Sequence, residues 1–346
     1  MRLMPETYHQ PERSTVDMRW RQLTTENHRG KQDDIFFLDA RTGWYVNGLG
    51  RIYKTTDGGE TWFLQFNKPG TYFRCIGFLD ERRGFAGNIS TDYFPGVTDT
   101  TPLYETRDGG DTWTAVTNIT GPTVKGLCAI YVRKIPFINA GVLDHRFHVF
   151  AAGRVGGPPF LLRSTDGGDT WISTDLGGAT AMILDVLFFD EQNGLICGAT
   201  DAAVEKSHAR IITTGDSGKT WTTRYESTRP YEITWKTSFP TRNTGYVTIQ
   251  SYDPDKSVTQ RYVAKSVDGG LTWSEVALAN DFALREFGIG FIDEKTGWVG
   301  GSNTGYETLD GGANWKPVNL GRAANKIRIV GGTGYAIGVD VFKLER

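Results

Sequence analysis

Several residue types are scarce in this chain of 346 residues, and their scarcity excludes whole classes of protein. There are only three cysteines, Cys75, Cys128 and Cys197, and no two of them have the CxxC spacing of a metal or redox site. They lie in apolar, strand-like segments, so we expect buried free thiols rather than a disulfide framework. No run of about 18 apolar residues occurs, so the sequence predicts no membrane-spanning helix.

The chain also lacks a strong charge of either sign. Its formal net charge is −2, and no run of Lys and Arg indicates binding to nucleic acid or to an anionic membrane surface. It has no P-loop, dinucleotide-binding fingerprint or Ser-His-Asp grouping, so no cofactor is predicted. His145 and His148 have no third ligand in view, and we expect surface histidines and no metal site.

The first residues lack an apolar stretch of the kind found in secretory signals. Residues 1–18 are therefore interpreted as an N-terminal extension. Either the protein is cytoplasmic or a signal was removed before this numbering begins, and the sequence leaves both alternatives open.

Glycine, with 43 residues, and aromatic residues, at 12%, are abundant by contrast. This composition, without long apolar periodicity, is typical of many short strands joined by tight turns. One motif, S/T-x-D-x-G-x-T-W, occurs six times, with Asn314 in place of the last Thr in the sixth copy. The copies are Thr55–Trp62, Thr106–Trp113, Ser164–Trp171, Thr214–Trp221, Ser266–Trp273 and Thr308–Trp315.

A second signature precedes most of these boxes: an apolar run, a polar turn ending in Gly, and another apolar run. It predicts a β-hairpin in which the Gly supplies a positive φ. The five copies are Phe37–Trp44, Phe78–Phe85, Phe188–Leu195, Phe239–Tyr246 and Phe291–Trp298.

Each repeat thus predicts four antiparallel strands, a to d, with the box between strands c and d. Such a unit is the blade of a β-propeller, an all-β fold in which stacked blades build the core. After the sixth box only three strands remain, at Lys326–Val330, Gly334–Gly338 and Val341–Glu345. We predict that Arg19–Leu23 pairs with this C-terminal unit, residues 325–346, as its fourth strand. The prediction is one seven-bladed domain, residues 19–346, whose ring is closed by the N-terminal strand.

The box aspartates are interpreted as scaffold rather than active site. Each carboxylate can accept N–H bonds from the turn that follows it, and the Trp can wedge between blades. A metal site is not indicated, because the residue three positions after the Asp varies from Asp to Lys, Leu and Ala. The six aspartates are Asp57, Asp108, Asp166, Asp216, Asp268 and Asp310.

These motifs resemble the Asp-box (BNR-repeat) propellers, and the GW turn with the T-x-DGG-x-TW box looks most like the photosystem II stability/assembly factor family. That resemblance implies a non-catalytic propeller, usually outside the cytoplasm, that docks membrane-protein precursors or assembly intermediates. Asp-boxes also occur in sialidases, xyloglucanase-type glycosidases and sorting receptors, so the motif indicates fold more strongly than function.

In a propeller the boxes share one rim with the a–b turns, so ligand sites are expected on the opposite rim. The family's arginine patch suggests Arg74, Arg154 and Arg285 by location, and Tyr93, Phe94 and Tyr104 surround the longest loop there. An aligned row of strand-a residues faces the channel near this rim. The row consists of Asp34, Cys75, Asp185, Lys236, Gly288 and Lys326.

Asp34 and Asp185 are the only catalytic candidates, for glycoside hydrolysis. They fall on opposite sides of the channel, which predicts a separation too large for a catalytic carboxyl pair. A sialidase is not indicated either: the Arg-Ile-Pro motif is missing, and Tyr225–Glu226 and Tyr231–Glu232 are adjacent pairs that point to opposite faces. The sequence therefore favours a protein-binding propeller. A glycan-active enzyme is the first alternative and a carbohydrate-binding propeller the second.

Overall fold

The structure is a computed structural model that describes residues 18–27 and 30–345. The predicted extension at residues 1–18, apart from Met18, lies outside the described residues. Within these residues the only helical element is a 3-10 turn, η1 (Val204–Lys206), and everything else regular is strand. No helix of the described part is long and apolar enough to cross a membrane. The all-β prediction is confirmed.

The strands form seven sheets, and the order within each runs from the innermost strand outwards. The first two are β2 (Gln32–Phe37), β3 (Gly43–Asn47), β4 (Arg51–Thr55), β5 (Phe63–Asn67), and β6 (Phe73–Phe78), β7 (Gly84–Asn88), β8 (Leu103–Thr106), β9 (Thr114–Ala115). The third is β11 (Ala129–Asn139), β12 (Val142–Ala152), β13 (Phe160–Ser164), β14 (Trp171–Asp175), β10 (Ile119–Thr120). The fourth is β15 (Met182–Phe188), β16 (Gly194–Ala199), β17 (Ala209–Thr214), β18 (Thr222–Glu226).

The fifth sheet is β19 (Glu232–Ser238), β20 (Gly245–Ser251), β21 (Gln260–Ser266), β22 (Ser274–Asn280). The sixth is β23 (Ile289–Phe291), β24 (Gly297–Val299), β25 (Gly305–Thr308), β26 (Lys316–Val318). The seventh is β27 (Lys326–Val330), β28 (Thr333–Ile337), β29 (Val341–Glu345), β1 (Arg19–Leu23). Neighbouring strands are antiparallel, except that the additional β10 pairs in parallel with β14.

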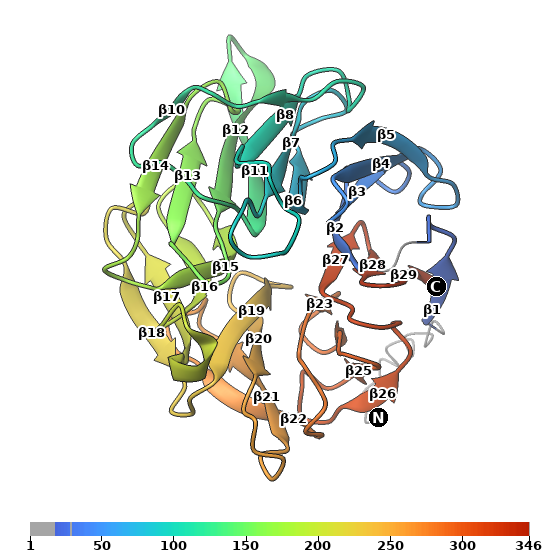
Figure 1. The fold of residues 1–346 in the computed structure, drawn as a ribbon, viewed down its shortest axis with the longest axis vertical. Coiled ribbons are helices and arrows are strands. Elements are labelled where there is room, and N and C mark those ends of the chain that lie inside the picture. The colour runs from blue at the N-terminus through green and yellow to red at the C-terminus, as the bar shows by residue number, and fades with distance from the viewer. Residues whose placement is uncertain (1–17, 28–29, 346) are drawn as a thin grey trace, which may run out of the picture.

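The seven sheets are arranged around a common centre (Figure 1). The innermost strands contact one another in cyclic order, from β2 through β6, β11, β15, β19 and β23 to β27, which contacts β2 again. Several inner strands are buried on both faces, as in β6 and β2, where nearly every residue is buried, whereas the outer half of β11 is exposed. Outer strands such as β5 and β18 are largely exposed. The three cysteines are free and buried, as predicted.

The two ends of the described chain share one sheet. β1 pairs antiparallel with β29, with Trp20 opposite Leu344 and Leu23 opposite Val341. Trp20 packs edge-on against Trp298 of the preceding sheet, with ring centroids 5.3 Å apart. The outermost position of the seventh sheet is therefore filled by the N-terminal strand.

The glycine of the a–b hairpins has a different role from the predicted one. None of the five has a positive φ. Instead, a Cβ on Gly43 would lie 2.6 Å from the ring of Phe37, and the other four glycines meet the phenylalanine of their own hairpin in the same way. The residue is Gly because the ring lies directly against its backbone. The four equivalent pairs are Gly84 with Phe78, Gly194 with Phe188, Gly245 with Phe239, and Gly297 with Phe291.

The other face of that phenylalanine contacts the sheet before it. Phe78 stacks on Trp44 with ring centroids 3.5 Å apart, and Phe37 stacks on Tyr335 at 3.7 Å. Phe188 on Phe150 and Phe291 on Tyr246 repeat the arrangement at 3.8 and 3.6 Å. The hairpin signature is thus an inter-sheet contact: the Gly admits the ring, and an aromatic side chain of the neighbouring sheet covers it.

The box turns satisfy their own polar groups. Asp57 accepts bonds from the Thr55 hydroxyl (2.8 Å), the Thr61 amide (3.0 Å) and the Thr61 hydroxyl (2.6 Å). In the sixth box Asn314 Nδ2 takes the place of the last hydroxyl, at 2.8 Å from Asp310. These donors lower the pKa of Asp57 to about 2, and the pKa of each of the other five box aspartates is also about 2. Because every carboxylate oxygen is used within its own turn, the boxes act as scaffold.

Leu23→Ala should lower the free energy of unfolding by about 2–5 kcal/mol, because Leu23 is buried and packs with Phe37 and Tyr335 in the core. Urea denaturation followed by tryptophan fluorescence measures the change. Gln22→Ala, at the exposed neighbouring position, should change it by no more than about 0.5 kcal/mol. Equal effects of the two substitutions would contradict the contribution of β1 to the core.

Candidate functional site

Most of the predicted channel row comes together at the centre of the molecule. Asp34, Cys75, Asp185, Lys236 and Lys326 lie on innermost strands, and all are buried. The row is therefore correctly placed on the inner strands. What decides its chemistry is how the charged groups are paired.

Asp34 is enclosed by donors and cations. Its carboxylate accepts from the amides of Ile35 and Ile76 at 2.9 and 3.0 Å, and the Lys326 ammonium lies 2.5 Å away. Arg328, which sequence reasoning did not single out, adds a contact at 3.2 Å. Burial alone would raise the pKa of Asp34, but Lys326 and Arg328 outweigh it and hold that pKa below its ordinary value. Asp34 is thus an ionised, fully used carboxylate and has no proton to donate at neutral pH.

Asp185 is paired in a similar way. Its carboxylate lies 3.8 Å from the Lys236 ammonium and accepts from the amide of Thr237 at 3.0 Å. Lys236 also donates to the carbonyl of Leu184. The two catalytic candidates therefore belong to two separate ion pairs, Asp34–Lys326 and Asp185–Lys236.

The space between these groups and the rim is closed. Asp33 and Arg74 form a buried ion pair there, and the Arg74 guanidinium lies over the ring of Trp235 at 5.2 Å. Within the described residues, the gap lined by Asp33, Arg74, Cys128, Trp235, Lys236, Asn325 and Lys326 has no room for a water molecule. At the predicted polar pocket the structure thus has a network of buried ion pairs.

Aromatic side chains gather above this network, at the rim formed by the b–c loops and the segments leading into the inner strands. Phe94 stacks on Tyr72 at 4.4 Å and meets Tyr93 edge-on at 4.8 Å. On the other side Phe287 packs edge-on against Trp235 at 6.3 Å. We refer to this group as the mouth cluster; its members are Tyr72, Tyr93, Phe94, Trp235, Tyr252, Phe287 and Arg285.

Cations lie among these rings. Arg285 stands over Tyr252 at 5.1 Å, and the Lys31 ammonium lies 5.5 Å from the ring of Phe287. Burial raises the pKa of Tyr252 to about 12; Tyr93 raises it further, and Arg285 opposes the rise, so these groups are within electrostatic range of one another. Burial lowers the pKa of Lys31 to about 7. Lys31 is thus only partly protonated at pH 7, and the positive charge of the mouth cluster comes from Arg285.

The eight predicted binding residues separate into accessible and buried groups. Tyr93, which is 40% exposed, and the half-buried Phe94 and Arg285 belong to the mouth cluster. Three of the others form the buried ion pairs described above and are not accessible to a ligand: Arg74, Lys236 and Lys326. Sequence reasoning missed Tyr252, Phe287 and Lys31, which carry no motif and meet only in three dimensions.

Arg154 and Tyr104 serve the interior as well. Arg154 donates to the carbonyls of Gly157, Ile89 and Thr91 at 2.9, 3.2 and 2.7 Å, which ties the longest rim loop to the third sheet. Tyr104 is buried, and its hydroxyl donates to Asp99 at 2.6 Å. Both residues shape the rim rather than face a ligand.

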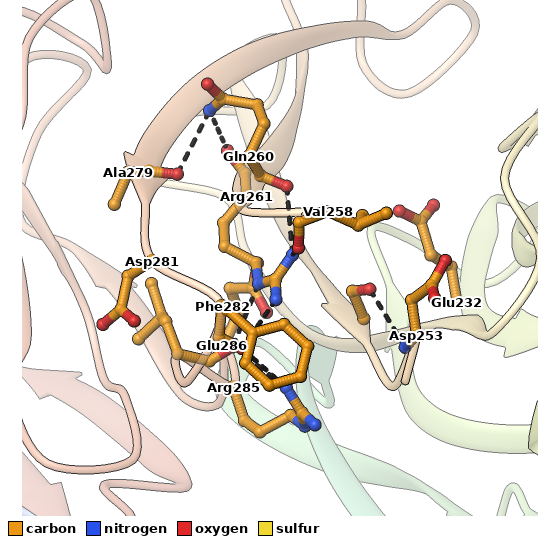
Figure 2. Close-up of polar contacts among 12 residues, drawn as sticks. Glu232, Asp253, Val258, Gln260, Arg261, Ala279, Asp281, Phe282, Arg285 and Glu286 are labelled. Atoms are coloured by element: carbon orange, nitrogen blue, oxygen red, sulfur yellow. Dashed lines mark hydrogen bonds and ion pairs between the residues drawn. The ribbon is translucent and has the colours of Figure 1, made fainter. Parts of the chain in front are cut away.

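A buried arginine holds the loops beside Tyr252 and Arg285 (Figure 2). Arg261 donates to the carbonyls of Leu284 (3.1 Å), Val258 (3.0 Å) and Phe282 (2.7 Å). Its Nε lies 3.9 Å from a carboxylate oxygen of the fully buried Glu286. Neither oxygen of Glu286 has a hydrogen-bond partner among the described residues. Burial raises the pKa of Glu286 to about 8, so this carboxyl is mostly neutral at pH 7.

One tyrosine–carboxylate pair bears on the sialidase alternative. The hydroxyl of Tyr225 donates to Glu275 of the next sheet at 2.5 Å, and Arg229 pairs with the same carboxylate at 2.8 Å. Sequence reasoning considered Glu226 instead, since it could not see across the sheets. Burial and Glu275 both raise the pKa of Tyr225, which is opposite to what a nucleophile needs.

His145 and His148, the two histidines considered as metal ligands, do not form a metal centre with other described residues. His145 and His148 lie on β12, and His148 is buried beside Glu191 at 4.0 Å. No group of three His, Cys, Asp or Glu side chains with metal-binding geometry occurs among the described residues.

Comparison with known proteins places this architecture among the β-propellers. No protein-family model matches the chain. A xyloglucanase from Paenibacillus sp is 34% identical over 98 residues, which are 24% of this chain and only 9% of the xyloglucanase.

Solved structures match over nearly the whole chain. YCF48 bound to D1 peptide has a TM-score of 0.63 at 16% identity, over 99% of this chain and 97% of that one, and YCF48 from Cyanidioschyzon merolae has 0.65 at 16%, over 94% and 99%. The GH74 enzyme of Niastella koreensis reaches 0.50 at 17%, over 88% and 62%. The WD40 β-propeller domain of Doa1 reaches 0.60 at 10%, over 94% and 96%. At these identities the likeness establishes the β-propeller fold predicted from the boxes.

Glu286→Gln should reduce the pH dependence of stability between about pH 5 and 8. The pKa of Glu286 is raised from 4.5 to about 8 in the folded chain, so the contribution of this carboxyl to stability is complete below pH 4.5 and is lost as the pH rises towards 8. Gln cannot ionise. The difference in melting temperature, mutant minus wild type, should therefore become more positive from pH 5 to 8.

The exposed Glu205 offers a matched control. Glu205→Gln should leave the slope of melting temperature against pH unchanged. A parallel pH profile for Glu286→Gln and the wild-type protein would show that the buried carboxyl is not neutral in the folded state.

Proposed function

We propose that the chain is a non-catalytic, seven-bladed propeller that binds a protein partner through the mouth cluster. The cyclic contacts of the seven inner strands and the pairing of β1 with β29 support a ring closed by the N-terminal strand. The observation that carries the binding role is the convergence of Tyr93, Tyr252, Phe287 and Arg285 on one rim, above a centre that is filled.

The composition of the mouth cluster suits a peptide or protein segment. Tyr, Trp and Arg are the residues that contribute most at protein interfaces, since they offer large contact areas at little conformational cost. Arg154 and Arg261 support the rim from below. Each of them donates hydrogen bonds to at least three loop carbonyls. A preorganised rim loses less conformational entropy on binding.

The resemblance to assembly factors supports the same class of partner. YCF48, whose structure covers nearly the whole of this chain, has been solved bound to a D1 peptide. By analogy, the proposed partner is a protein or assembly intermediate, including one associated with a membrane. The analogy concerns the class of ligand and not its identity.

Photocrosslinking can test the assignment of the rim. A photoreactive amino acid at position 93 should give discrete protein crosslinks in native extract, whereas the same group at position 271 should give none. Leu271 is a matched control because it is exposed on a box turn, at the opposite rim. Binding of the captured protein should weaken at least about tenfold in Tyr93→Ala/Arg285→Ala. Equal crosslinking at both positions would contradict the proposal.

A glycan-active propeller is the alternative, and it has specific support. The xyloglucanase match and the GH74 structure both connect this chain to glycan-active propellers, and exposed aromatic rings such as Tyr93 can stack on sugars. Against catalysis, the buried carboxylates of Asp34 and Asp185 are each paired with a lysine.

A glycosidase screen separates the two functions. Wild-type protein incubated with xyloglucan and sialylated glycans should release no reducing sugar, because it has no protonated carboxyl beside an open site. Asp34→Asn should instead lower the free energy of unfolding by about 3–5 kcal/mol, since it leaves the buried Lys326 and the half-buried Arg328 without their counter-charge. Hydrolysis by the wild type that is lost in a folded Asp185→Asn variant would refute the non-catalytic function.

A further inference from the structure

The third sheet carries a feature that no other sheet has. Its two inner strands, β11 and β12, are each 11 residues long and pair with one another along their whole length, from Ala129–Ala152 at the base to Asn139–Val142 at the turn. Only Val149–Ala152 of β12 pairs onward with β13. The a–b connection of this sheet is therefore a long β-hairpin, and its green turn extends outside the ring of sheets in Figure 1.

The base of this hairpin is fixed to the propeller. Val132 and Phe147 pack against the buried core of the second and third sheets. Arg133 donates to the carbonyl of Phe188 at 3.3 Å, and Arg146 forms an ion pair with Glu191 on the next sheet's a–b turn. The outer half is thus a rigid projection and not a loose loop.

The tip of the hairpin is apolar and exposed. Ile138, Val142 and Leu143 are 68%, 68% and 61% exposed, and Phe137 is 37% exposed. Ile138 lies opposite Leu143, so these two side chains share one face, whereas Phe137 and Val142 point to the other. The tip is therefore apolar on both faces. A group of large apolar side chains at the end of a projection is unusual for a surface that meets only water.

The strands behind the tip are basic. Between Ala129 and Ala152 there are three cationic side chains, Arg133, Lys134 and Arg146, against the one carboxylate of Asp144. Glu191 of the next sheet balances Arg146, so the local net charge is +1 in a chain whose net charge is −2. Lys134 is exposed and lies four residues before Ile138 on the same strand and face. The net charge of the whole chain hides this local excess of positive charge, and it therefore did not indicate binding to an anionic membrane.

We propose that the hairpin tip, Phe137–Leu143, inserts into the interfacial region of an anionic lipid bilayer while the basic strands behind it contact the headgroups. A bilayer surrounds an inserted tip on all sides, which fits apolar side chains on both faces, and anionic headgroups complement the charge behind it. A second copy of the chain fits less well, since a stable dimer interface needs about 20–30 residues a side and the tip offers four large apolar ones. The proposal does not depend on the function of the mouth cluster.

Vesicle flotation tests the proposal with the full chain. Wild-type protein should float with phosphatidylglycerol-rich vesicles and associate less with pure phosphatidylcholine. Ile138→Ser/Leu143→Ser should weaken the association at least about tenfold, and Lys134→Glu about fivefold for the anionic vesicles alone. All changes are at exposed positions, so melting temperatures should stay within about 2 °C of wild type.

A matched variant removes equally exposed apolar side chains elsewhere. Val267→Ser/Leu309→Ser changes residues that are 67% and 58% exposed on box turns, and it should bind vesicles like the wild type. A tryptophan at position 138 should shift its emission to the blue when vesicles are added. Failure of the wild type to float, equal loss in both double variants, or a dimer in sedimentation that Ile138→Ser/Leu143→Ser abolishes would each overturn the proposal.

Discussion

The stack of a phenylalanine ring from one sheet on an aromatic ring of the sheet before it is the contact on which this propeller depends. Phe78 illustrates it: Gly84 admits the ring on one side, Trp44 covers it at 3.5 Å on the other, and Trp113 of its own box meets its edge at 6.0 Å. A four-stranded sheet has two apolar faces and cannot be stable alone. This stack recurs at four of the sheet–sheet interfaces, and the residues that form it come from the hairpin signature, with the box tryptophan at its edge.

Charge pairing determines what the centre can do. Polar side chains buried on the inner strands must find partners or incur a desolvation cost. Asp34 meets two cations, Asp185 meets Lys236, and Asp33 meets Arg74. The charged side chains that led us to predict a polar pocket are thus paired with one another. The candidate binding surface is therefore at the loops, whose side chains take no part in these ion pairs.

The sequence predicted what is local and repeated. The four-strand unit, the box turns and the strand near Trp20 follow from patterns within about fifty residues of one another or from counting the units. Contacts between units are invisible in such patterns. Gly43 was therefore assigned a positive φ when its real constraint is the ring of Phe37, and Arg328 was overlooked beside Asp34. The sequence predicted only part of the mouth cluster. Tyr93, Phe94 and Arg285 lie in segments that could be recognised as rim loops, whereas Tyr252 and Phe287 come close to them only in the folded chain.

The two rims of the propeller face opposite directions, and this has a consequence for any partner held at the mouth cluster. The a–b hairpin of the third sheet leaves the box rim, whereas Tyr93 and Tyr252 follow strand b on the other rim. The strands between them are five to seven residues long in most sheets, which corresponds to roughly 17–23 Å. A bilayer at the hairpin tip would therefore lie at least that far from the mouth cluster, on the opposite side of the ring. A membrane-embedded partner could occupy the mouth only with a segment that extends well beyond the headgroups, so an extended tail or a long extramembrane loop satisfies the geometry and a short inter-helix turn does not.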